Sequence, residues 1–123
     1  MPQTVAVIGA SSDRAKFGNK AVRAFRERGY TVWPVNPHET EIEGLPAYAS
    51  IADVPGPVDM VTFYVRPDVG LQVIDAVAAR QPGEVWLNPG SESDALIARA
   101  RALGIEPIAA CSIMGIGLSP YGL

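Results

Sequence analysis

The sequence predicts a three-layer α/β domain in which helices cover both faces of a five-stranded, mostly parallel sheet. Five short apolar runs, rich in Val and Ile, recur at fairly regular intervals along the 123 residues. These runs do not alternate apolar with polar residues, which is typical of parallel strands buried on both faces. Helical patterns lie between most of them, and strand–helix–strand repeats favour right-handed parallel crossovers. We therefore expect a Rossmann-like fold.

The five apolar runs are the predicted strands. They are Val5–Ile8, Thr31–Val35, Val58–Val65, Glu84–Leu87 and Ile105–Ile108. Pro34 lies inside the second run, and a proline in a central strand removes a ladder hydrogen bond. Its position close to the end of the strand makes that loss tolerable.

Three amphipathic stripes predict the helices between the strands. The stripes are Phe17, Ala21, Val22 and Phe25; Val69, Val73, Ile74 and Val77; and Leu96, Ile97, Ala100 and Leu103. Gly29, Pro82-Gly83 and Gly104 end these helices, and a cap region at Ser91 and Ser93 begins the third. The segment 36–57 lacks a helical pattern, so we expect a loop there with one short turn near Ser50–Asp53.

The composition limits the classes of partner. The formal net charge of −3 argues against non-specific binding to nucleic acid or to anionic membranes, because both favour a basic surface. We expect a single domain over residues 1–123, without a signal peptide or a membrane span, in the cytoplasm. One cysteine, Cys111, excludes an internal disulfide and a cysteine-based zinc site.

The turn after the first strand carries the strongest chemical signal. Glycine lets backbone N–H groups approach an anion, the following helix N-terminus adds partial positive charge, and hydroxyl and cationic side chains surround it. The residues that predict a phosphate site are Gly9, Ala10, Ser11, Ser12, Arg14, Lys16 and Gly18. The spacing is neither the compact dinucleotide fingerprint nor a Walker sequence. The alternative is that Gly9 only makes a tight turn and that the charges are solvated.

The end of the second strand bears on the identity of the ligand. NAD sites usually place an acidic residue there, whereas this chain has Asn36 followed by Pro37. Asn36 can bind a ribose or a phosphate without repelling a phosphorylated ribose, although Asn-Pro also starts ordinary turns. Glu39, Glu41 and Glu43 follow, and we interpret them as a solvated, solubilising loop.

Several segments in order closely resemble the stand-alone CoA-binding-domain proteins of bacteria and archaea, which are similar to the CoA-binding domain of the succinyl-CoA synthetase alpha subunit. The segments that carry the resemblance are Val7–Ser12, Lys16–Asn19, Pro34–Pro37, Gly44–Tyr48, Asp59–Val61, Val65–Pro67 and Val85–Gly90. The resemblance covers nearly the whole chain. It implies that coenzyme A lies across the carboxyl ends of the strands, as ligands do in open α/β sheets.

The resemblance also implies a role for each loop. Gly9, Ala10, Ser11, Ser12 and Lys16 would surround the nucleotide phosphates, and Asn36 with Pro37 would flank the adenosine. The adenine and pantetheine path would be lined by Tyr64, Val65, Arg66 and Pro67, and the pantetheine arm would face Asn88, Pro89 and Gly90. The chain departs from the family at Asn88, where a longer amide is usual, and around Cys111, where polar neighbours are missing.

No catalytic machinery is predicted. The single histidine, His38, lies in a loop and is interpreted as exposed or as a ligand contact, not as the phosphorylated histidine of the synthetase. His, Cys and carboxylates are too few to predict a metal site. Cys111 is interpreted as a small buried hydrophobe, with a mixed disulfide to the CoA thiol as the alternative. Trp33, Trp86 and Met114–Gly117 are interpreted as packing residues, and the last run could also cover a second copy in a homodimer.

The sequence thus predicts a protein that binds coenzyme A or acyl-CoA without activity of its own, as a regulator or carrier. An NAD(P)-binding domain of a small oxidoreductase or redox sensor is the main alternative. A protein-interaction module without a small ligand is a second alternative. The acyl group, the partner protein and the oligomeric state stay open.

Overall fold

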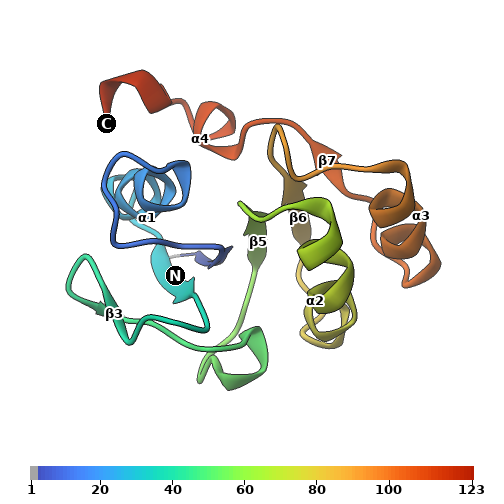
Figure 1. The fold of residues 1–123 in the computed structure, drawn as a ribbon. Helices are drawn as coiled ribbons and strands as arrows, with labels where there is room; N and C mark the ends of the chain where they lie inside the picture. Colours follow the sequence, from blue (N-terminus) through green and yellow to red (C-terminus); the bar gives the residue numbers. More distant parts are fainter. Residues whose placement is uncertain (1–2) are drawn as a thin grey trace.

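The computed structural model describes residues 3–123 and contains a five-stranded sheet in the order β2-β1-β5-β6-β7 (Figure 1). All four neighbouring pairs are parallel. The strands are β1 Thr4–Ile8, β2 Thr31–Val35, β5 Met60–Phe63, β6 Glu84–Leu87 and β7 Ile108–Ala109. The predicted Rossmann-like fold is confirmed. Because β1 lies between β2 and β5, the chain reverses its direction of travel across the sheet at the β1–β5 boundary.

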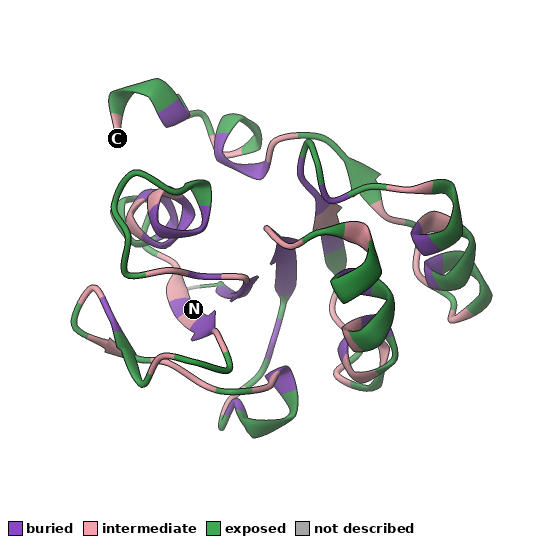
Figure 2. Cartoon of the chain, in the orientation of Figure 1, coloured by how far each residue is buried: buried purple, intermediate pink, exposed green. Residues whose placement is uncertain are grey.

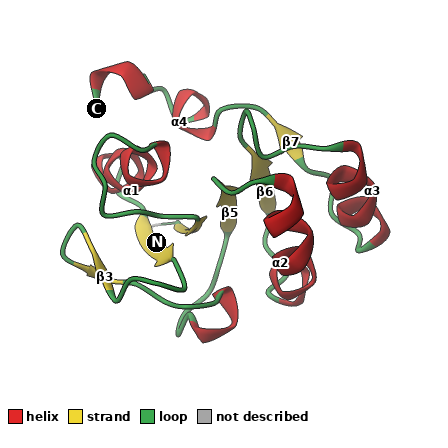
Figure 3. Ribbon diagram, in the orientation of Figure 1, coloured by secondary structure: helices red, strands yellow, loops and turns green. Residues whose placement is uncertain are grey.

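The predicted helices are present, and two short helical segments follow β7 (Figure 3). The helices are α1 Phe17–Glu27, α2 Pro67–Ala79, α3 Asp94–Ala102 and α4 Ser112–Gly115, with 3₁₀ turns Ile51–Asp53 and Pro120–Gly122. The Ser93 hydroxyl accepts the N–H of Leu96 at 3.1 Å, which caps α3 as predicted. The short turn expected near residue 50 is the first 3₁₀ turn.

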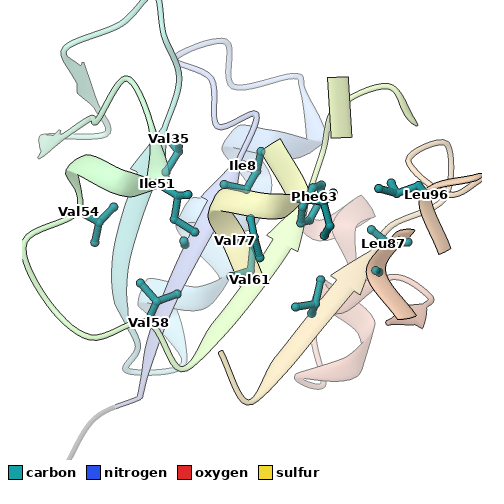
Figure 4. Packing of buried hydrophobic residues seen from close by; sticks show 14 residues of the cluster. Ile8, Val35, Ile51, Val54, Val58, Val61, Phe63, Val77, Leu87 and Leu96 are labelled. Atoms are coloured by element: carbon teal, nitrogen blue, oxygen red, sulfur yellow. The ribbon is translucent and has the colours of Figure 1, made fainter. Parts of the chain in front are cut away.

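Two buried apolar clusters lie on opposite faces of the sheet. One joins the strands to α2, α3 and the Ile51 turn, and Figure 4 shows its side chains, including Phe63, Val77 and Leu96. The other joins the opposite strand faces to α1, α4 and the C-terminal residues. Figure 2 shows the central strand β5 buried along its length while the outer faces of the helices are exposed. The strands therefore carry continuous apolar runs because each face packs under a helical layer.

The fifth strand begins later than the sequence indicated. The prediction placed it at Ile105–Ile108, whereas β7 spans Ile108–Ala109. Ile105 instead donates its N–H to Ala100 O at 2.9 Å, and Gly104 has φ +85°. Gly104 therefore ends α3. The N–H of Ile105 is bonded to this helix end, so it is not available for pairing in the predicted strand. The prediction for the third long run was also too long, since β5 covers only Met60–Phe63.

A small hairpin interrupts the loop expected over 36–57. Its strands are β3 Glu41–Ile42 and β4 Leu45–Pro46, and they pair antiparallel. Glu43 and Gly44 between them have φ of +51° and +77°, the positive pair that a tight two-residue hairpin turn requires. Ile42 is buried against the α1 side of the core, which holds the hairpin in place.

Pro34 occupies an edge strand, because β2 is the outermost strand of the sheet. Its carbonyl accepts the N–H of Tyr48 at 2.9 Å, and Tyr48 O accepts the N–H of Asn36 at 2.9 Å. A residue in a strand directs its N and O to the same side, so the missing N–H of Pro34 faces away from β1. No ladder bond to β1 is lost.

Candidate functional site

The carboxyl ends of β1 and β5 meet at the point where the strand order reverses, and Gly9 lies there. A Cβ on Gly9 would be 2.5 Å from Tyr64 O and 2.8 Å from Val65 Cγ1, and the residue has φ +87°. On the other side, Gly18 of α1 packs against the Gly9 carbonyl. Only glycine fits between these two neighbours, so Gly9 and Gly18 bring the first turn, α1 and the end of β5 into direct contact.

Three adjoining hollows cross this edge of the sheet. The β2-side hollow, of about 470 Å³, is lined by residues that include Asn36, Pro37, His38, Val69 and Gln72. The turn hollow, of about 320 Å³, is lined by Gly9, Lys16, Phe17, Gly18, Tyr64, Val65, Pro89, Gly90 and Ser91. The C-terminal hollow, of about 230 Å³, is lined by Phe17, Tyr64, Asn88, Pro89, Cys111, Met114, Pro120 and Tyr121.

Neighbouring hollows share wall residues. Gly9 and Val65 line both the β2-side hollow and the turn hollow. Phe17, Tyr64 and Pro89 line both the turn hollow and the C-terminal hollow. The three hollows therefore lie side by side along the carboxyl ends of the strands. A further hollow, of about 480 Å³, lies at the amino ends around Asp59 and Glu84, away from every predicted site residue.

The first turn is held by its own side chains. The Ser11 hydroxyl accepts the N–H of Asp13, and the Asp13 carboxylate accepts the N–H of Ala15, both at 3.0 Å. Lys16 lines the turn hollow and makes no ion pair within residues 3–123. Arg14 lies 3.8 Å from Glu43 and lines none of the three hollows. The structure thus brings Lys16 to the hollow and directs Arg14 to the hairpin.

The interpretation of the acidic loop as solvated was wrong for two of its three glutamates. Glu39 Oε2 accepts the backbone N–H of Ser12 at 3.0 Å. Glu43 Oε2 accepts the carboxamide of Asn19 at 3.1 Å. Glu39 and Glu43 are half-buried, and only Glu41 is exposed. Glu39 thus contacts the first turn and Glu43 contacts α1, both far away in sequence, so residue type alone did not predict these contacts.

Asn36 connects the end of β2 to the first turn. Its Nδ2 donates to Ala10 O at 2.8 Å, and its Oδ1 accepts the N–H of His38 at 2.7 Å. Pro37 and His38 line the β2-side hollow beside it. The Asn36 carboxamide therefore orders the two loops that border this hollow.

A buried polar network lies beneath the C-terminal hollow. Asn88 Nδ2 donates to Thr62 Oγ1 at 2.7 Å and to Phe63 O at 2.8 Å, and Asn88 Oδ1 accepts the N–H of Ser112 at 2.9 Å. The Ser112 hydroxyl lies 2.7 Å from Thr62 Oγ1 and 3.1 Å from the Tyr64 hydroxyl. Asn88 thereby joins β5, β6 and the start of α4.

Burial raises the pKa of Tyr64 from 10.0 to about 12, and this effect outweighs the opposing hydrogen bond with Ser112. The neutral phenol is favoured in the folded state, so its contribution to stability is intact below pH 10 and is lost as the pH rises through 12. Wild type should lose about 2 to 3 kcal/mol more than Tyr64→Phe across this interval. Urea denaturation at several pH values tests this, and parallel profiles for the two proteins would contradict it.

Two predicted packing residues line the C-terminal hollow instead. Cys111 was interpreted as buried, but it is only half-buried and lines this hollow. Met114 is 64% exposed, so its interpretation as a core residue was wrong. Phe17, assigned to the buried stripe of α1, is 46% exposed at the first residue of that helix and lines two hollows. A helix-period pattern does not distinguish a core position from a ligand-facing one at a helix end.

The remaining predicted site residues lie near the hollows to different extents. Val65, Pro89 and Gly90 line the turn hollow. Pro67 begins α2, and Arg66 before it pairs with Asp68 at 2.9 Å in an exposed position outside the three hollows. Tyr121 and Gln72 are hollow-lining residues that the sequence analysis did not propose.

A parallel α/β sheet with its hollows at the carboxyl ends, beside a glycine turn and a helix N-terminus, defines a Rossmann-like nucleotide-binding class of protein. Comparison with known families narrows the class. Residues 3–116 match the CoA binding domain family, and the chain belongs to it. The predicted family is therefore confirmed.

Relatives of known name or structure agree with this assignment. The alpha subunit of ADP-forming acetate–CoA ligase II from Pyrococcus furiosus is 42% identical over 65 residues, 52% of this chain and 14% of the subunit. A conserved hypothetical protein from the same organism has a TM-score of 0.84 and 34% identity, with 94% of this chain and 99% of that chain covered. Acetyl-coenzyme A synthetase 1 from Ca. Korarchaeum cryptofilum, solved with phosphate and ADP, has a TM-score of 0.76 and 30% identity, with 89% and 26% covered.

Residues 3–123 contain neither a candidate metal cluster nor a helix that could span a membrane. No group of three His, Cys, Asp or Glu side chains in this part of the chain lies close enough together to hold a metal ion. No helix in it combines the length and apolar character needed to cross a bilayer.

Proposed function

We propose that this domain is a cytoplasmic module that binds coenzyme A or an acyl-CoA and performs no reaction by itself. The observation that carries the proposal is the row of three adjoining hollows across the carboxyl ends of the strands. CoA is a long ligand with a nucleotide at one end and a thiol at the other. A row of hollows with a polar turn at its middle and an apolar end matches that order of groups.

The turn hollow suits the phosphates. It is lined by Lys16, Phe17 and Gly18, at the start of the 11-residue helix α1. The first N–H groups of a helix have no intrahelical acceptor, and the helix dipole adds partial positive charge there. The Lys16 ammonium adds a full charge at the same place.

The C-terminal hollow suits the thiol end of the ligand. Its lining is mostly aromatic and apolar, with the Cys111 thiol among it and no charged side chain. The adenosine would then occupy the β2-side hollow, between Asn36-Pro37 and the exposed side of α2. We propose a regulatory or carrier role for the domain. The segment of the ligase alpha subunit that it matches is 14% of that subunit's length.

One observation favours the alternative of an NAD-binding domain. The Glu39 carboxylate lies after β2, where NAD sites place an acid for the ribose hydroxyls. This residue already accepts hydrogen bonds from Ser12 and Asn36, and the first turn lacks the compact dinucleotide fingerprint. We therefore rank CoA first.

Isothermal titration with CoA, dephospho-CoA, NAD and NADP tests the proposal directly. We expect saturable binding of CoA at sub-millimolar concentration and weaker responses to NAD and NADP. A thermal melt provides the second readout, because a ligand at a hundred times its dissociation constant adds about 2.7 kcal/mol of stability. Absence of CoA binding together with a clear NAD response would transfer the assignment to the alternative.

A further inference from the structure

Glu39 places a negative charge on the first turn of the free protein. Its Oε2 atom accepts the N–H of Ser12 at 3.0 Å and the Nδ2 group of Asn36 at 3.3 Å. Two donors from different loops therefore converge on a single anionic oxygen. Ser12 and Glu39 line none of the three hollows, but the same turn carries Gly9 and Lys16, which line the turn hollow where the proposed function places phosphate.

The carboxylate is held by dipoles and not by a counter-charge. The Arg14 side chain pairs with Glu43, and Glu39 itself forms no ion pair among the described residues. Two N–H donors converging on one charged oxygen form the arrangement that backbone turns offer to phosphate oxygens. The Ser12 N–H and the Asn36 carboxamide thus stabilise an anion, and in the free protein that anion is the carboxylate of Glu39.

A phosphate and the Glu39 carboxylate would repel each other if both stayed near Ser12. Like charges a few ångströms apart disfavour each other, so the phosphate and the carboxylate would compete for the Ser12 N–H. Glu39 lies in no strand or helix, so its displacement from the first turn would break no strand pairing of the five-stranded sheet. The ligand, in contrast, is fixed by several other contacts along its length.

We infer that Glu39 is an internal competitor for one phosphate of the ligand, so that it weakens nucleotide binding and helps to select which nucleotide is accepted. This inference rests on the proposed function. Binding of CoA then requires the Ser12 N–H to exchange the Glu39 carboxylate for a phosphate oxygen, and the loop with Glu39 moves outward as this happens.

The test compares Glu39→Gln with wild type. Glutamine has the same shape and can still accept the Ser12 N–H, so it removes the charge with little change to the loop. Glu41→Gln is the matched control, because it removes the same charge from an exposed residue two positions further along the chain, at the start of β3. Thermal melts verify that both variants fold, and Glu39→Ala provides a second variant without the charge.

Titrations of each protein with CoA and with dephospho-CoA give the readout. Glu39→Gln should bind CoA about tenfold more tightly than wild type, since one charge-assisted hydrogen bond no longer has to be displaced. The gain should shrink at high ionic strength. If the affinity rises for CoA alone, the phosphate that competes with Glu39 is the 3′-phosphate. If the affinity rises equally for dephospho-CoA, the competing phosphate belongs to the diphosphate.

The outcomes separate the two proposals. Equal CoA affinity in wild type, Glu39→Gln and Glu39→Ala, or weaker binding by both variants, would overturn the role of Glu39 and leave CoA binding intact. An equal gain in Glu41→Gln would also overturn it, because the effect would then be one of net charge. Absence of CoA binding by all four proteins would instead reject the proposed function.

Discussion

Replacing Gly9 by alanine is expected to lower the free energy of unfolding by about 3 kcal/mol. The added Cβ would lie 2.5 Å from Tyr64 O, a backbone atom that no rotamer change can move. Overpacking of this kind costs about 1 to 3 kcal/mol, and the positive φ adds about 1 to 2 kcal/mol for a residue with a Cβ. Urea denaturation measures the loss, and CoA titration of the folded fraction should show weaker binding because the turn is displaced.

Gly29→Ala is the control for Gly9→Ala. Gly29 has φ +85°, almost the same as Gly9, but a Cβ there would meet no heavy atom within 4 Å. It should therefore cost only the backbone strain, about 1 kcal/mol, and leave CoA affinity unchanged. Equal losses for the two variants would mean that the contact between β1 and the end of β5 is not tight, and the account of the first turn would be wrong.

Asn88→Ala should have an effect of similar size by a different mechanism. The substitution leaves the buried N–H of Ser112 without an acceptor. It also removes the two hydrogen bonds that the Asn88 carboxamide donates to Thr62 and Phe63 of β5. A buried unsatisfied polar group costs about 1 to 3 kcal/mol, and the space left by the side chain adds to this cost. We expect a total loss of about 3 kcal/mol, measured by urea denaturation.

Ser91→Ala provides a graded comparison for Asn88→Ala. The Ser91 hydroxyl donates one hydrogen bond, to Phe63 O at 3.1 Å, and that carbonyl keeps Asn88 as its second donor. The loss should therefore be about 1 kcal/mol. If Asn88→Ala cost no more than Ser91→Ala, the connection between β6 and α4 would not depend on the carboxamide.

The parts of the fold that were predictable from sequence are those governed by local rules. Apolar runs such as Val5–Ile8 and caps such as Ser93 depend on neighbours a few residues away, so periodicity and capping identify them. The β3–β4 hairpin was missed because each strand has only two residues, too few to show alternation. The start of β7 was misplaced because the end of α3 uses the N–H of Ile105.

The loops that form the candidate site were predictable from the sequence, but the contacts of its acidic side chains were not. Gly9, Lys16 and Pro89 form the walls of the hollows because a turn after a parallel strand always lies at this edge of the sheet. The position of Glu39 depends on a contact between residues 27 apart in sequence. Nothing in the local pattern distinguishes it from Glu41, which is two residues away and exposed.

The two outer margins of the sheet are both protected from intermolecular pairing. On one margin, Pro34 offers no donor, and the Tyr48 backbone already covers its carbonyl and the N–H of Asn36. On the other margin, β7 contributes only Ile108 and Ala109, too short a template for a stable added strand. Strand addition at either margin of this sheet therefore has little free backbone on which to begin, which disfavours fibrillar self-association along these two strands.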